Sequence, residues 1–255
     1  MDMIIDAPTA CDIPALRALW KQAFGDTDEF LDAFFDTAFS SERARRVSID
    51  GKTVAALYWF ECTCRGERIA YIYAVATDNR FRGRGLCTAL MENTRAQLEA
   101  LGYKAAVLVP GSFELFDFYK KRGYVTCSRV SELCVSAKKG SALVREIETD
   151  EYARLRREYL PVGGVEHSIE AIRFLSTQSR LFATEKALLA ARIEGDTLAC
   201  VELLGDVSEA ESIVYALGCT EGRFRTVGEQ RDFAMYLPLG EKKIVPPTYF
   251  GLAFD

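Results

Sequence analysis

The sequence predicts an α/β protein with mixed sheets, divided into two units. Segments with helical spacing of apolar residues alternate with strand-like runs along the whole chain. Glycine-containing turns such as Asp50-Gly51 join neighbouring strand-like runs, which is a strong hairpin signal. The charge balance changes near residue 140. Residues 1–140 contain 19 Lys and Arg against 18 Asp and Glu, whereas residues 141–255 contain 13 against 19, so the net charges are +1 and −6.

The composition narrows the class of protein. With 255 residues, 49% of them hydrophobic, the chain can bury a sizeable core. Its longest apolar run, Val54 to Phe60, is too short to span a bilayer, and the acidic N-terminus is not a signal peptide. Neither half is basic enough for a nucleic-acid surface. We therefore expect a cytoplasmic protein that binds neither nucleic acid nor membrane.

Eight cysteines without a secretion signal indicate free thiols in a reducing compartment. The single histidine, His167, excludes zinc sites built on two or three histidines, and we expect no metal. His167 precedes an expected helix start, with Ser168 as a candidate N-cap, and is interpreted as a surface or capping residue.

The first half begins with a strand at Met3–Ile5. A helix follows Asp12, with Pro14 in its first turn, where a missing N–H has no cost. The apolar stripe of a second helix begins near Asp28 and faces the core; its members are Leu31, Phe34, Phe35, Ala38 and Phe39. Three strands are then expected at Arg45–Asp50, Thr53–Glu61 and Glu67–Ala76.

A long helix is expected from Leu86 to Leu101, because Gly102 stands just beyond its end. The remaining elements of this half are a strand, a helix and two further strands, at Ala105–Val109, Phe113–Lys121, Tyr124–Cys127 and Val130–Val135. The segment Ser136–Ser141 has the composition of a linker.

The second half contains an echo of the first. Residues 49–55 and 193–199 both fit the pattern I-D/E-G-x-T-V/L-A, and each copy follows a helix rich in Phe and Leu. A diverged internal repeat and a chance resemblance between two hairpins both explain the pattern. The C-terminal run after Pro246-Pro247 is strand-like, and we expect it to be tied into a sheet.

A glycine-rich loop lies between the strand that ends near Ala76 and the long helix. It reads Arg82, Gly83, Arg84, Gly85, Leu86, Cys87 and Thr88. Glycines allow close backbone approach, and the N–H groups of the helix start converge on an anion such as a pyrophosphate. The Walker pattern is absent, and the dinucleotide fingerprint fails at its third glycine.

The pattern that remains is Gln/Arg-x-x-Gly-x-Gly/Ala, and residues 113–124 contain the second signal, FYKKRGY. Together, in this element order, they make residues 1–135 resemble the GCN5-related N-acetyltransferase (GNAT) superfamily. The resemblance implies a GNAT-type mixed, mostly antiparallel sheet flanked by helices. It also implies a GNAT domain over residues 1–137 and a smaller, degenerate GNAT-like unit over residues 141–255.

The resemblance further implies acetyl-CoA as co-substrate and a small-molecule or peptide amine as acceptor, and it leaves a homodimer open. Strand-like pairing near Val75, Ala76 and Thr77 would hold the pantetheine arm, the loop from Arg82 to Thr88 would hold the pyrophosphate, and Tyr119 would protonate the departing thiolate.

Two positions depart from the family pattern. Cys87 stands where glycine or alanine is usual, and Ile69 stands where many members have a glutamate base. Tyr71 and Tyr73 share the face of Ile69 by period-two alternation, so they are candidates for lining the acceptor pocket and equally for ordinary strand aromatics. A non-catalytic CoA-binding or protein-interaction module of the same fold is the alternative function.

Overall fold

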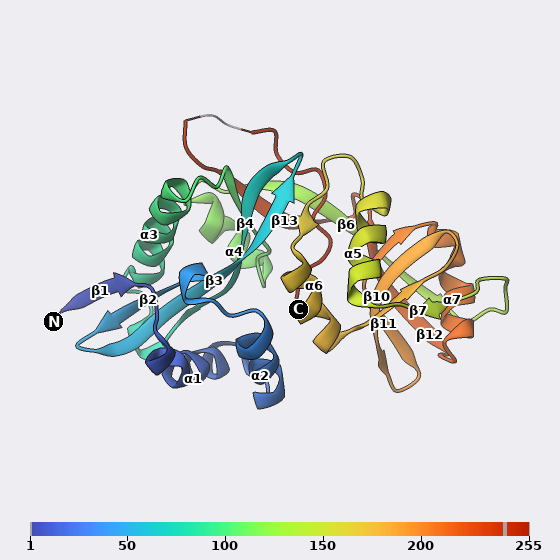
Figure 1. The fold of residues 1–255 in the computed structure, drawn as a ribbon, viewed down its shortest axis with the longest axis horizontal. Helices are drawn as coiled ribbons and strands as arrows, with labels where there is room; N and C mark the ends of the chain where they lie inside the picture. Colours follow the sequence, from blue (N-terminus) through green and yellow to red (C-terminus); the bar gives the residue numbers. More distant parts are fainter. Residues whose placement is uncertain (1, 242–243, 255) are drawn as a thin grey trace.

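One continuous sheet runs the length of the molecule (Figure 1). The computed structural model describes residues 2–241 and 244–254. The strand order is β1-β2-β3-β4-β5-β13-β6-β12-β11-β10-β9-β7, and β8 pairs with β3 outside this series. The strands are β1 (Met3–Asp6), β2 (Ala44–Ile49), β3 (Lys52–Cys64), β4 (Glu67–Thr77), β5 (Ala105–Leu108), β6 (Val125–Ser136), β7 (Arg145–Glu146), β8 (Glu166–His167), β9 (Arg180–Ala183), β10 (Ala187–Glu194), β11 (Thr197–Gly205), β12 (Glu221–Val227) and β13 (Arg231–Pro238).

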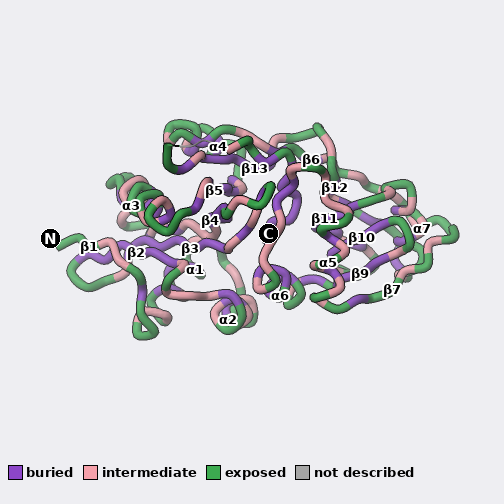
Figure 2. Tube along the Cα trace, turned by 45° about the horizontal axis from the view of Figure 1, so that its top comes forward, coloured by how far each residue is buried: buried purple, intermediate pink, exposed green. Residues whose placement is uncertain are grey.

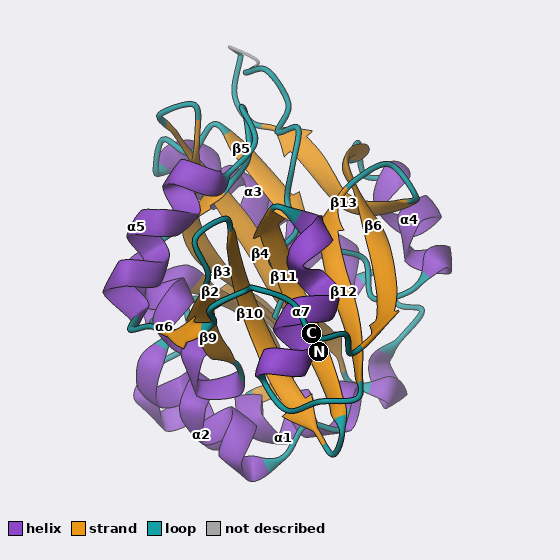
Figure 3. Ribbon diagram, turned by 90° about the vertical axis from the view of Figure 1, so that its right-hand side faces the viewer, coloured by secondary structure: helices purple, strands orange, loops and turns teal. Residues whose placement is uncertain are grey.

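Helices cover both faces of this sheet (Figure 3). They are α1 (Ile13–Phe24), α2 (Asp28–Thr37), α3 (Leu86–Ala100), α4 (Phe113–Lys120), α5 (Thr149–Tyr159), α6 (Ile169–Gln178) and α7 (Ala210–Ala216). The predicted class, a mostly antiparallel mixed sheet flanked by helices, is confirmed, since only the pairs β4–β5 and β11–β12 are parallel among the named strands. No helix in the described ranges is long and apolar enough to cross a membrane.

The first hairpins form as the sequence predicts. Asp50 and Gly51 both have positive φ, 48° and 78°, in the two-residue turn between β2 and β3. Arg65 and Gly66 repeat this geometry between β3 and β4, with φ of 52° and 78°. Two successive left-handed residues match the twist of the flanking strands.

The core forms layers on either side of the sheet (Figure 2). One layer packs α1 and α2 against the sheet face that carries Tyr58 and Phe60. The opposite layer packs α3 and α4 against the face that carries Leu57 and Trp59. The first layer continues into the second half through α5 and α6, and the Phe34 and Phe174 rings lie 5.5 Å apart across the junction.

Strand β13 joins the two halves most directly. It comes from the second half, yet it lies between β5 and β6, and Met235 pairs with Leu108 on one side and Thr126 on the other. The division into residues 1–137 and 141–255 stays a prediction. The two predicted units share one sheet, because β13, a strand of the second unit, lies within the sheet of the first.

The proposed internal repeat also stays a prediction, and the topology favours a different register for it. Hairpin β10–β11 leads through the short 3₁₀ helix η4 (Val207–Glu209) and α7 to β12, which is parallel to β11. The same series in the first half is hairpin β3–β4, η3 (Asn79–Phe81), α3 and β5. Asp78 and Asp206 begin η3 and η4 alike, each accepting a backbone N–H at 2.9 and 3.0 Å. The turn at Gly195 therefore corresponds to Gly66 rather than to Gly51.

Two expectations about strands are wrong. Tyr124–Cys127 and Val130–Val135 are not separate strands, because residues 125–136 form the single strand β6. The C-terminal run is not a strand either. It makes one isolated bridge, between Gly164 and Tyr249, and otherwise lies as an irregular segment against the core.

Candidate acetyl-transfer site

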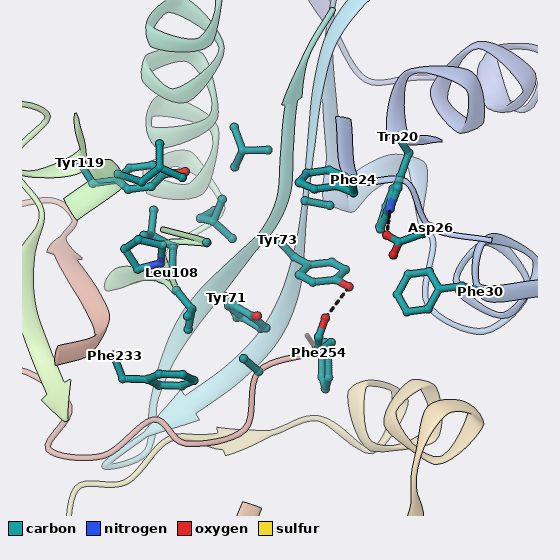
Figure 4. Close-up of a pocket in the computed structure, with 18 of the residues that line it drawn as sticks. Trp20, Phe24, Asp26, Phe30, Tyr71, Tyr73, Leu108, Tyr119, Phe233 and Phe254 are labelled. Atoms are coloured by element: carbon teal, nitrogen blue, oxygen red, sulfur yellow. Dashed lines mark hydrogen bonds between the residues drawn. The ribbon is translucent and has the colours of Figure 1, made fainter. Parts of the chain in front are cut away.

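A cavity of about 440 Å³ opens beside the middle of the sheet (Figure 4). It combines residues of both halves and is strongly aromatic. Its lining comprises Trp20, Phe24, Asp26, Phe30, Tyr71, Ile72, Tyr73, Ala74, Val75, Leu108, Val109, Pro110, Gly111, Leu115, Tyr119, Arg231, Phe233, Ala253 and Phe254. The sequence-predicted residues Tyr71, Tyr73, Val75 and Tyr119 therefore lie around one space.

The cavity exists because β4 and β5 separate. Their parallel pairing covers only Ile69, Ala70 and Tyr71 of β4, although that strand continues to Thr77. On its other edge β4 stays paired with β3 through Ala76 and Thr77. Ala74, at the point of divergence, has the positive φ of 48° that accompanies a local distortion. The β5-facing edge of β4 beyond Tyr71 is thus available to an extended ligand, whereas Ala76 itself is buried in the core.

Tyr119 projects from α4 into the cavity (Figure 4). Only 7% of the residue is exposed, and its ring packs edge-on against those of Phe118 and Tyr124. Burial raises the pKa of the Tyr119 phenol above its usual value near 10; the Cys87 thiol adds to the rise and Arg122 opposes it. The phenol therefore keeps its proton at neutral pH and can donate it.

The glycine-rich loop lies outside the cavity, at the start of α3. Gly83 and Gly85 have φ of 75° and 77°, and a Cβ on either would meet no atom within 4 Å. Gly85 is the N-cap residue of α3, so the first N–H groups of the helix have no partner inside the helix. Arg82 and Arg84 are exposed, and each donates to a backbone carbonyl within this region, of Thr77 and Arg80 respectively. The loop thus combines unpaired backbone N–H groups with the positive charges of Arg82 and Arg84, and both features favour an anion.

Arg122 was not singled out by the sequence, although it lies within FYKKRGY. It connects the end of α4 to the start of α3 by donating to the Thr88 hydroxyl and, at 2.6 Å, to the Phe118 carbonyl. Its guanidinium also lies 3.3 Å from the centre of the Phe118 ring. Thr88 therefore accepts from a protein group. Cys87 is partly buried beside this junction, and burial raises the pKa of its thiol, which disfavours a thiolate nucleophile.

Tyr71 and Tyr73 contact the C-terminal segment. Tyr73 donates a hydrogen bond of 2.9 Å from its hydroxyl to the Phe254 carbonyl. The Phe254 ring lies 5.7 and 5.8 Å from the rings of Tyr71 and Tyr73. The tail is thus a wall of the cavity. Ile69, where a base was sought, is fully buried and paired with Cys62.

The far wall carries one carboxylate. Asp26 follows α1 and accepts a 2.7 Å hydrogen bond from the Trp20 indole N–H. It is the only acidic side chain lining this cavity within the described residues. The surrounding rings of Trp20, Phe24 and Phe30 give it an apolar, π-rich frame, which suits an ammonium group.

A buried charged network anchors the tail. Arg156 donates at 2.7 and 2.9 Å to both oxygens of Glu202, and the pair is 2% and 0% exposed. Tyr249 donates at 3.2 Å to the same carboxylate, and Arg156 also donates to the Val165 carbonyl. A buried ion pair is stable only when its polar atoms are hydrogen-bonded in this way. Because Tyr249 is one of the donors, the network fixes the position of Tyr249.

His167 is partly buried and both of its ring nitrogens are inaccessible, which corrects the interpretation of a surface residue. It belongs to β8, and its ring lies 5.1 Å from that of Phe250. Burial, and then the charge of Arg156, lower the pKa of His167 well below its ordinary range. The predicted N-cap is confirmed, because Ser168 accepts from the Ala171 N–H at 3.2 Å.

A cavity at the β4–β5 divergence with a helix start beyond it is the arrangement that the resemblance to acetyltransferases of the GNAT type leads us to expect. Residues 5–127 match the family model described as an acetyltransferase (GNAT) domain. Residues 5–127 are therefore similar to the domains of this family. Comparison with curated proteins gives no match.

Several solved structures are similar over both halves. A GCN5-related N-acetyltransferase from Kribbella flavida is 15% identical with a TM-score of 0.70, covering 92% of this chain and 70% of that one. The corresponding protein from Anabaena variabilis is 15% identical, with a TM-score of 0.70 and coverages of 92% and 72%. Eis1 from Mycobacterium abscessus is 12% identical, with a TM-score of 0.69 and coverages of 93% and 73%. At these identities the likeness establishes the fold.

Proposed function

We propose that the chain is an acetyl-CoA-dependent N-acetyltransferase that transfers acetyl directly to a primary amine. The observation that carries the proposal is the position of Tyr119. Its protonated hydroxyl faces the gap between β4 and β5, where a thioester aligned with the free edge of β4 would present its sulfur. The site residues Val75, Ala76 and Thr77 would offer backbone groups to the pantetheine arm.

The loop from Arg82 to Thr88 would hold the pyrophosphate. Its glycines leave space for close approach, and the α3 N–H groups with Arg82 and Arg84 supply donors and positive charge. Arg122 would support this role indirectly by fixing Thr88 against α4.

The transfer needs few protein groups. The bound ammonium first loses a proton to solvent, and the neutral amine then attacks the carbonyl carbon, so that a C–N bond forms and the C–S bond breaks. Tyr119 gives its proton to the departing sulfur, and the second proton that the nitrogen loses is returned to Tyr119 through solvent, which restores the phenol. Orientation of the two reactants in one cavity supplies much of the remaining acceleration.

The acceptor side favours a cationic amine with an apolar body. Asp26 would attract the ammonium form, and the rings of Trp20 and Phe30 would contact the carbon chain. The acidic balance of the second half, −6, would add long-range attraction that weakens with salt.

The second half would contribute walls rather than a second acetyl-CoA site. Its parallel strands β11 and β12 pair again at Leu203 and Thr226 beyond a register shift after Cys200, whereas β4 and β5 do not pair beyond Tyr71. No glycine-rich loop precedes α7, because η4 leads directly into that helix.

A thiol-release assay with acetyl-CoA and a panel of amines, with mass spectrometry of the products, tests the proposal. We expect free CoA and an N-acetylated product in equal amounts. If acetyl-CoA binds but no amine of the panel causes release of free CoA, the result would instead support the non-catalytic module.

A further inference from the structure

Two further cavities extend the candidate site into the second half. A space of about 170 Å³ shares Asp26, Phe30, Ala253 and Phe254 with the first cavity. A larger space of about 540 Å³ shares Gln178, Ser179 and Arg192 with the middle one. Common lining residues therefore show that the middle space adjoins both the Tyr119 cavity and the space at the ends of α6 and β10.

Ser179 is the notable residue of this series. It is the C-cap residue of α6, only 6% exposed, and it lines both further cavities, the middle one and the larger one. Its backbone N–H donates to the Leu175 carbonyl, but its hydroxyl has no hydrogen-bond partner among the described residues. A buried hydroxyl without a partner is costly and rare in native proteins. Because the hydroxyl as placed has almost no accessible surface, a ligand group in the adjoining space would satisfy it after rotation about the serine χ1 bond toward that space.

Three of the charged residues around the larger cavity, Glu146, Arg180 and Arg192, form ion pairs, and Glu148 adds a further carboxylate to its lining. Arg180 binds Glu146 at 2.6 Å, and Arg192 lies 3.4 Å from Glu194. Gln178 donates its amide N–H to the Thr177 hydroxyl at 2.9 Å and keeps a neutral amide carbonyl. Of the residues shared by the two further cavities, Ser179 and Gln178 thus offer a ligand a neutral hydroxyl and a neutral amide, while Arg192 is ion-paired. They suit neutral hydrogen-bonding partners better than an ion.

We propose that these residues form a distal subsite for the uncharged polar portion of an elongated amine acceptor. The amine would occupy the aromatic cavity at Asp26, and hydroxyl or amide groups farther along the same molecule would bond to Ser179 and Gln178. This inference rests on the proposed function for its amine end. It assigns to the second half a direct role in acceptor choice.

Ser179→Ala tests the subsite, with three amines as probes: phenethylamine, a lysine-containing tripeptide amide and an amino disaccharide. We expect KM for the tripeptide or the disaccharide to rise roughly three- to tenfold, the effect of one lost neutral hydrogen bond, with kcat unchanged. The KM for phenethylamine should not change. Whichever elongated probe responds tells whether amide or hydroxyl groups occupy the subsite.

Stability distinguishes a binding role from a structural one. Because the Ser179 hydroxyl has no internal partner, Ser179→Ala should leave Tm unchanged or raise it. Thr226→Val is the matched control, since the buried Thr226 hydroxyl donates to the Leu203 carbonyl at 3.0 Å. That variant should lower Tm and leave the KM of every probe unchanged.

Calorimetric titration of the same amines separates this inference from the proposed function. If Ser179→Ala weakens binding of an elongated amine although no amine is acetylated, the subsite stands and the proposed activity is wrong. A variant that binds both elongated probes as the original chain does, or that has a lowered Tm, overturns the subsite.

Discussion

Tyr119→Phe is the sharpest test of the candidate site. The substitution keeps the ring that packs against Phe118 and Tyr124, at centroid distances of 5.2 and 5.7 Å. It removes only the hydroxyl, which makes no hydrogen bond with the described residues. Folding should therefore be nearly unaffected, with the free energy of unfolding at pH 7 changed by less than about 1 kcal/mol.

The catalytic effect should be much larger. Loss of a general acid lowers kcat by roughly 10²-fold or more. Two factors of ten correspond to about 2.7 kcal/mol in the activation free energy. The dissociation constant of acetyl-CoA should stay close to normal, because the groups that would hold its pyrophosphate lie on the α3 side.

The assay is steady-state thiol release from pH 6 to 10, with Tyr124→Phe as the matched control. Tyr124 is also buried and its pKa is also raised by burial, but it does not line the Tyr119 cavity. That variant should retain kcat. Since burial raises the pKa of Tyr119 above 10, the phenol should stay protonated, and kcat should show no loss of this acid below about pH 10.

The same pKa shift has a consequence for stability. A folded-state pKa above the unfolded value contributes stability that is present below pH 10 and lost as the pH rises beyond it. Tyr119→Phe should remove that contribution, so the unfolding free energy of this variant should fall less steeply above pH 10, by about 1.4 kcal/mol per pH unit.

An unchanged kcat of Tyr119→Phe would refute the catalytic role and leave Tyr119 a packing residue.

Four other predictions follow from the geometry. Gly85→Val should weaken acetyl-CoA binding at least tenfold by calorimetry, because the new side chain would enter the open space at the start of α3. Gly102→Val is the control for backbone strain, since Gly102 has a similar φ of 82° at the other end of the helix. This variant should bind acetyl-CoA normally. Asp26→Asn should raise KM for cationic amines about tenfold or more through loss of a charged hydrogen bond, and an equal KM would exclude Asp26 from acceptor binding. Titration should give one acetyl-CoA per chain, and two sites of similar affinity would contradict the role given to the second half. A fragment of residues 1–140 should show no cooperative thermal unfolding, since it lacks β13; a folded, fully active fragment would show that the strand is dispensable.

Local signals were enough to predict much of the first half. The left-handed pair Asp50-Gly51 specifies its own turn, and Gly102 ends α3 through a conformation that other residues rarely adopt. The glycine-rich loop and Tyr119 were found because their chemistry lies within short stretches of sequence. Their arrangement around a common ligand remains a prediction, although Tyr71, Tyr73, Val75 and Tyr119 do line one cavity.

The acceptor wall could not be predicted in this way. Trp20 and Phe30 have the spacing of ordinary core residues, and nothing in the tail sequence distinguishes a cavity wall from an edge strand. Phe254 reaches Tyr73 across 181 positions in the chain. His167 was misjudged for the same reason, because its burial is produced by Phe250 and by pairing of β8 with β3. Long-range packing of this kind has no local sequence signal.

The placement of β13 and the tail joins the two halves in the fold and, under the proposed function, at one site. β13 separates β5 from β6, so β5, which borders the gap beside β4, depends on residues more than 120 positions later in the chain. The next segment then crosses to the cavity, where Ser128 accepts from the Phe250 N–H at 2.8 Å and Tyr249 bonds to Glu202. A change in the Arg156–Glu202 pair would therefore disturb the Phe254 wall without touching any residue of the first half. The described part of the second half contains no anion-binding loop, which fits the role proposed for it. A unit that shapes the acceptor side needs a rigid sheet and a fixed C-terminal segment, but it does not need to bind a pyrophosphate.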